Sequence, residues 1–171
     1  NWDVSSVTNM VEMFRDAEEF NQPLESWNVS SVINMAGMFL NAIMFNKPLN
    51  LWNVSNVISL QNTFKNADDF NRPLNDWNTS SLANLADTFK DNNSFNQNLS
   101  NWDTSSVIYM SGTFQNTVFN NGLTGVLSNT LVWNTSSATT MANMFSGASL
   151  FKGNISSWNV SNVTNMNRMF F

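Results

Sequence analysis

The sequence predicts an α/β repeat solenoid, a stack of about seven coils that each contribute one short strand to a parallel sheet and one short helix or 3₁₀ segment. Two observations predict it. Seven tryptophans recur along the 171 residues at spacings of 25, with one spacing of 31: Trp2, Trp27, Trp52, Trp77, Trp102, Trp133 and Trp158. Within each unit, the apolar spacing alternates between the strand period and the helix period. A fixed period of roughly 20 to 50 residues is typical of solenoids.

The strand is expected around each tryptophan. In the second unit Leu24, Trp27, Val29 and Val32 follow the spacing L-x-x-W-x-V-x-x-V. Trp27 and Val29 are two residues apart, so in an extended segment both would face the core. The second residue after each tryptophan is Val or Thr, which strands favour. We expect these segments to pair as a parallel sheet with rungs about 4.8 Å apart.

The helix is expected to follow the strand. From Val7, the apolar residues Met10, Phe14 and Ala17 lie at i+3, i+7 and i+10, which is one face of a short helix. The polar residues on either side would form its solvated face. The N-cap stays open among Ser5, Ser6 and Thr8.

Ladders of like side chains are expected in the core, because no single unit can bury its own apolar side. The tryptophans form one ladder. A second contains Phe14, Phe39, Phe64, Phe89, Phe114, Phe145 and Phe170. A third contains Phe20, Phe45, Phe70, Phe95, Phe119 and Phe151. An amide row is expected to hydrogen-bond to the backbone and along the stack, through Asn21, Asn46, Asn71, Asn96 and Asn120.

The units are expected to form a single array over residues 1–171, with coils starting at the seven tryptophans. The long fifth unit contains an insertion at about residues 124–130, which should leave the stack as a loop. The chain opens in repeat register at Asn1 and stops midway through a repeat at Phe171, which suggests an excerpt of a longer protein.

Composition argues against several partners and cofactors. The net charge is −5, and seven Lys and Arg residues are scattered along the chain, so nucleic acid is not an expected partner. His and Cys are absent, which removes the usual general base, the thiol nucleophile and most metal ligands, and no cofactor or metal is expected. No run of about 18 apolar residues occurs, so this segment is not expected to insert into a membrane.

An enzyme is not expected either. The densest carboxylates are Asp68 and Asp69, and the group of Asp16, Glu18 and Glu19. Glycoside hydrolysis needs two carboxylates at a set separation across a cleft. Here the acids lie among polar residues and vary from unit to unit, which is typical of a solvated surface. A hydrolase using Asp68 or Asp69 is the remaining catalytic alternative.

The polar residues of the expected sheet form the candidate binding face, because solenoids bind through extended repeated surfaces. One row follows the tryptophans: Asp3, Asn28, Asn53, Asn78, Asp103, Asn134 and Asn159. The serine row beside it includes Ser30, Ser55, Ser80 and Ser105. Such a lattice suits protein or carbohydrate through many modest hydrogen bonds, and it is equally consistent with a solvated surface.

The repeat resembles that of a known family. The residues that carry the likeness are the run Trp27 to Val32, then Asn34-Met35, Met38-Phe39, Ala42, Phe45-Asn46 and Pro48-Leu49. They resemble the BspA-like leucine-rich-repeat surface proteins, in the 25-residue type of mycoplasma lipoproteins. The resemblance covers the whole chain, apart from the interrupted fifth unit and Ala138, where other units have Val or Leu.

This resemblance implies a leucine-rich-repeat-like solenoid with no catalytic residues, displayed outside the cell on a cell or virion surface. Its implied role is adhesion, or contact with protein or carbohydrate. The alternative is a structural protein whose copies associate end to end into a fibre, coat or sheath on a cell or virus particle. Exposed, uncapped ends and low charge motivate that alternative.

Overall fold

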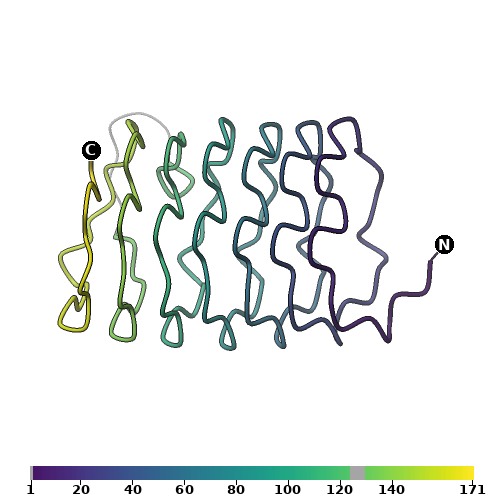
Figure 1. Ribbon diagram of the computed structural model, residues 1–171, viewed down its shortest axis with the longest axis horizontal. Helices are drawn as coiled ribbons and strands as arrows, with labels where there is room; N and C mark the ends of the chain where they lie inside the picture. Colours follow the sequence, from purple (N-terminus) through teal and green to yellow (C-terminus); the bar gives the residue numbers. More distant parts are fainter. Residues whose placement is uncertain (1, 124–129) are drawn as a thin grey trace.

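The computed structural model describes residues 2–123 and 130–171 as a stack of coils that runs from one terminus to the other (Figure 1). Each coil passes through a turn at the lower edge, climbs one side, turns again at the upper edge and returns on the opposite side. Successive coils lie side by side, so residues 25 apart in sequence become neighbours in space (Figure 1).

The predicted α/β fold class is wrong. The described residues contain no helix and no named strand, and regular pairing is limited to isolated parallel bridges. The main row of bridges links Asn9, Asn34, Ser59, Asn84, Tyr109, Thr140 and Asn165 in turn. This row lies in the segment predicted as helix, whereas the segments predicted as strands, from each tryptophan to the following Val or Thr, carry no bridge in the described part of the chain.

A chain of tight turns replaces the predicted helix. In the first coil Glu12 and Asp16 have φ of 55° and 59°, and the same two positions are left-handed in the third coil at Asn62 and Asn66, with φ of 57° and 54°. A left-handed residue every fourth position ends any α-helix. Gly, Asn and Asp occupy most of these positions, which are the residues that tolerate this conformation best.

Backbone hydrogen bonds alternate between the coil itself and its neighbour. The Arg15 N–H donates to the Glu12 carbonyl at 3.1 Å and closes a turn. The N–H groups of Glu12, Phe14 and Asp16 donate to the next coil, at 2.9, 2.8 and 2.8 Å. The i, i+4 apolar spacing therefore suits a run of four-residue turns as well as a helix. Inter-coil bonds satisfy the backbone groups that a helix would pair internally.

A second backbone ladder lies just below the first. The Ile58 N–H donates to the Ile33 carbonyl, Ala83 to Ile58 and Ile108 to Ala83, each at 2.9 Å. The same bond continues at both ends of the row, through Thr8, Thr139 and Thr164. This side of the stack is consequently held in a fixed coil-to-coil register.

The two predicted phenylalanine ladders are confirmed. Phe64 is fully buried, with its ring centroid 5.6 Å from Phe39 on one side and 5.6 Å from Phe89 on the other. Within its own coil it packs against Phe70 of the other ladder at 4.1 Å. The tryptophan rings stack from Trp77 through Trp102 and Trp133 to Trp158, at 6.2, 6.2 and 6.4 Å.

Polar groups inside the stack also pair from coil to coil. The Trp77 indole N–H donates to the Leu49 carbonyl of the preceding coil at 2.9 Å. The amide row behaves as predicted: the Asn71 side-chain oxygen accepts the backbone N–H of Asn96 at 3.0 Å, and the equivalent bond runs along the row. The insertion predicted at 124–130 falls outside the described residues except for Thr130, which is bridged to Asn154.

No helix in the described ranges is long and apolar enough to cross a membrane.

Candidate functional site

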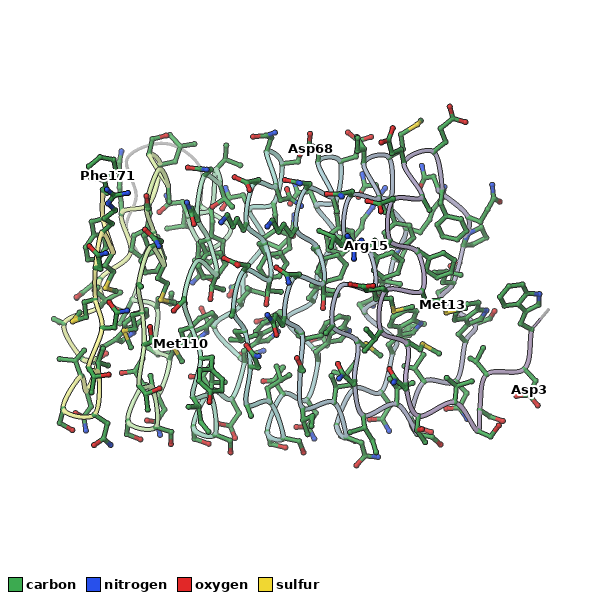
Figure 2. The ribbon with its side chains drawn as sticks, viewed as in Figure 1. Asp3, Met13, Arg15, Asp68, Met110 and Phe171 are labelled. Atoms are coloured by element: carbon green, nitrogen blue, oxygen red, sulfur yellow. The ribbon has the colours of Figure 1, made fainter. Side chains whose placement is uncertain are left out.

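The aspartate and asparagine row of the candidate binding face lies along the lower edge of the stack, where every member is exposed, whereas Ser30, Ser55 and Ser105 of the serine row are half-buried. Asp3 marks its first position (Figure 2). The Asn28 side-chain oxygen accepts the Ser30 backbone N–H at 3.2 Å and the Ser30 hydroxyl at 2.7 Å. The same cap joins Asp3 to Ser5, Asn53 to Ser55, Asn78 to Ser80, Asp103 to Ser105, Asn134 to Ser136 and Asn159 to Ser161. Each oxygen therefore supports the lower turn of its own coil.

Two members of this row are acids whose capping bonds favour the charged form. Hydrogen bonds from Ser5, first from its side chain and then from its backbone, lower the pKa of Asp3 below the ordinary 3.8. The corresponding bonds from Ser105 lower the pKa of Asp103. Both carboxylates are therefore held ionised by the turns that they cap.

The serine row is used by the neighbouring coil. The Asn56 side-chain nitrogen donates to the Ser30 carbonyl at 2.8 Å, and the Ser81 hydroxyl donates to the Ser55 carbonyl at 2.6 Å. The structure brings the predicted residues together on one edge, where their oxygens accept hydrogen bonds that stabilise the turns and the contacts between coils. The amide nitrogens of the asparagines are left as outward donors, because each cap consumes only the oxygen.

An apolar row that the sequence interpretation missed lies beside this edge. Ile33, Ile58 and Ile108 are 45%, 47% and 36% exposed, and Ala83 stands between the last two. These residues belong to the second backbone ladder, one coil apart. Tyr109 follows Ile108 in the sequence and is 48% exposed. The helix interpretation placed Thr8, the first-coil equivalent of Ile33, on a solvated face, and the apolar residues at this position of later coils were the signal against it.

Charge is almost absent from the first part of this side of each coil, and charged residues such as Glu12, Asp87 and Arg168 follow that part directly. The segments concerned are 3–11, 28–36, 53–61, 78–86, 103–111, 134–142 and 159–167. Of 12 acidic and 7 basic residues in the chain, only Asp3 and Asp103 fall in them. We call the exposed side chains of these segments the neutral face. Its centre is the row of Ile33, Ile58, Ala83 and Ile108.

Carboxylates gather at the opposite, upper edge, where Asp68 is seen in Figure 2. They border an open groove of about 430 Å³, whose lining includes Glu18, Asn41, Asn66, Asp68, Asp91 and Asn116.

Within that groove the amides pair along the stack. Asn66 donates to Asn41 at 2.7 Å, and Asn41 donates to Asp16 at 2.6 Å. Asn116 donates to Asp91 at 2.7 Å. A carboxylate can only accept, so each acid terminates a run of amide bonds. Over residues 2–123 and 130–171, no group of three His, Cys, Asp or Glu side chains is arranged to hold a metal ion.

Comparison with known proteins identifies one family. The family model described as "Mycoplasma protein of unknown function, DUF285" matches residues 1–75, 49–129 and 119–171, so its matches together span the whole chain. Searches of curated proteins and of solved structures found no match.

Proposed function

The chain belongs to the Mycoplasma family of proteins of unknown function, DUF285, and we propose that it is a non-catalytic repeat module displayed at a surface, where it adheres to protein or carbohydrate. The proposed location is extracellular, on a cell or virion. The proposal retains the surface display that the resemblance to BspA-like proteins implies. It does not include the strand and helix expected in each leucine-rich-repeat coil, because the described residues do not form them.

One observation carries the proposal. On the neutral face Ile33, Ile58, Ala83 and Ile108 follow one another in one row, which has Thr8, Thr139 and Thr164 at its outer coils, and the capping asparagines and aspartates form another row. Backbone bonds to both neighbours fix the position of each coil, so little freedom is lost when a partner binds. Extended repeated surfaces of this kind suit adhesion.

The chemistry of the side chains supports a non-catalytic role. The chain has no His and no Cys, which removes the usual general base and the thiol nucleophile. Asp68 accepts a hydrogen bond from the Asn93 side chain at 3.2 Å, and Asp69 is exposed. Both acids belong to the polar surface of the upper edge.

The test is adhesion of beads coated with the 171-residue chain. Targets are immobilised extracellular glycans and matrix proteins, and beads coated with a heat-unfolded sample provide the control. Retention that needs the folded chain supports the proposal. Beads that pass every target at the rate of the control would contradict it.

Assembly of copies into a fibre, coat or sheath is the second candidate, favoured by the regularity of the stack. The Phe39, Phe64 and Phe89 rings repeat at 5.6 Å, and successive coils are hydrogen-bonded in the same way. A sedimentation coefficient of the native protein that does not change with protein concentration would exclude this candidate.

A further inference from the structure

We propose that the neutral face binds an uncharged, extended polysaccharide that lies along the stack and passes one sugar residue per coil. This inference rests on the proposed adhesive function and assigns the chemical class of the partner. Three features of this face favour such a partner: its lack of charge, its apolar row and its free side-chain donors.

The charge pattern excludes polyelectrolytes first. Between Asp3 and Asp103 the neutral face presents no ionised group over three consecutive coils, from Asn28 to Ala86. A charged polymer laid there would lose hydration without gaining a counter-charge, which is unfavourable. Asp3 and Asp103 each cap a lower turn of their own coil, and they do not form a row of charges along the stack. An uncharged partner has no hydrated charges, so it does not incur this cost on binding.

The apolar row supplies contact area. Ile33, Ile58 and Ile108 are exposed and aligned by the ladder bonds of their own backbone. Exposed apolar groups gathered within a polar rim mark interaction sites. Two other exposed apolar residues lack such partners: Ile43 lies between Glu18 and Asp68 in its row, and Leu51 lies between Ser26 and Asp76. Ile33 and Ile58, in contrast, are neighbours in one row of the neutral face.

The flanking amides supply directional bonds. On the lower side, Asn28, Asn53 and Asn78 keep free side-chain nitrogens. On the upper side, the Asn34 oxygen caps the Ala36 N–H at 2.9 Å, which leaves its nitrogen as a donor as well. Sugar hydroxyl and ring oxygens accept such bonds, while the C–H groups of the sugar ring pack on isoleucine and on the Tyr109 ring.

The spacing favours a polymer over a folded protein surface. Hydrogen-bonded neighbours are about 4.8 Å apart, so the isoleucine row repeats at that step. One hexose of an extended β-1,4-linked chain advances by a similar distance, which allows each coil to meet one sugar, with successive sugars presenting alternate faces. A folded protein presents irregular groups and has no such repeat to match.

The test is affinity electrophoresis of the 171-residue chain through gels containing hydroxyethyl cellulose or carboxymethyl cellulose, which share a backbone and differ in charge. We expect retardation by the neutral polymer only. Its strength should stay constant when salt rises from about 50 mM to about 500 mM, because no charges are paired. Cello-oligosaccharides should compete.

Variants locate the contact. Ile58→Lys and Ile58→Ser should each weaken retardation at least about tenfold, equivalent to about 1.4 kcal/mol. The matched control is Ile43→Lys, since Ile43 is an exposed isoleucine outside the neutral face. This substitution should change the retardation less than about twofold. Thermal unfolding of each variant checks that the fold is retained. Serine introduces no charge, so its effect separates lost contact area from repulsion.

Three results would overturn the inference: no retardation by hydroxyethyl cellulose, retardation by the carboxymethyl polymer alone, or equal losses for Ile43→Lys and Ile58→Ser. If the coated beads adhere to matrix proteins while neutral polysaccharides have no effect, the partner is a protein. In that case the inference fails and the proposed adhesive function stands. If the beads adhere to nothing, both fail.

Discussion

Substitutions at Asn62 distinguish the chain of turns from a helix, because the two structures predict opposite signs for the stability difference between the Gly and Ala variants. Asn62 has φ of 57°, and its N–H donates to Ala86 of the next coil at 3.0 Å. An L-residue such as Ala pays about 1–2 kcal/mol in the left-handed region, while Gly pays nothing there. Gly gains about 0.4–1 kcal/mol of entropy in the unfolded chain, which offsets part of that difference.

The net expectation is that Asn62→Gly is more stable than Asn62→Ala by about 0.5–1 kcal/mol. Asn143 occupies the equivalent position three coils away with φ of 56°, so changing both sites should double the difference. A helix predicts the opposite order, with Ala more stable than Gly by about 1 kcal/mol per site.

The assay is urea unfolding followed by tryptophan fluorescence and far-UV circular dichroism, with coincident transitions as the check for two-state behaviour. Gln61 is the matched control, since it precedes Asn62 and its φ is not positive. At this position the Gln61→Ala variant should be more stable than the Gln61→Gly variant. If Ala also exceeds Gly at Asn62 and Asn143, the chain of turns is refuted.

Three further predictions follow from the ladders and caps. Phe64→Ala should lower the free energy of unfolding by about 3–5 kcal/mol in the same urea assay, because the ring is fully buried, whereas Phe170→Ala, 61% exposed, should cost less than about 1 kcal/mol. Asn71→Ala removes the acceptor of the part-buried Asn96 N–H and should cost about 1–3 kcal/mol; the control is Asn75→Ala, which removes the acceptor of the Asn101 N–H in an exposed bond, and an equal or larger loss there would contradict this. The pKa of Asp103 measured by NMR should lie below 3.8 and rise in Ser105→Ala. Because the pKa is depressed in the folded state, the stabilising effect of Asp103 is present above pH 3.8 and lost as pH falls through the folded value, so the stability difference from Asp103→Asn should shrink there.

The sequence was sufficient for the core ladders because each depends only on the repeat period and on one residue type per unit. Phe64 must meet Phe39 and Phe89 whenever successive units stack in register. The amide row through Asn71 follows from the same logic. Neither prediction needed the backbone conformation of the coil.

The backbone conformation was mispredicted because two periodicities are close. Met10 and Phe14 are four residues apart, which suits a helix of 3.6 residues per turn and equally a run of four-residue turns. The discriminating signal was a pair of rows, four residues apart, rich in Gly, Asn and Asp. Gly37 and Asn41 illustrate it in the second coil, both with positive φ. Periodicity of apolar residues outweighed this turn chemistry in the interpretation.

The expected strand failed for a related reason. The residues after each tryptophan, as in Asn28, Ser30 and Ser31, are the residues of capped turns, and the structure uses them so. The structure places the residues of the candidate face along one edge, where their side-chain oxygens cap turns, and binding by this face stays a prediction. The isoleucine row was missed because a helix would have turned Ile33 toward solvent among polar neighbours.

We expect recognition to use the neutral face and to leave the carboxylate edge free. An NMR titration of the 171-residue chain with cellohexaose, following the isoleucine methyl groups, tests this. The signals of Ile33, Ile58 and Ile108 should shift together with one dissociation constant, while that of Ile43 stays fixed. Shifts confined to Ile43, beside Glu18 and Asp68, would contradict it, as would the absence of any shift.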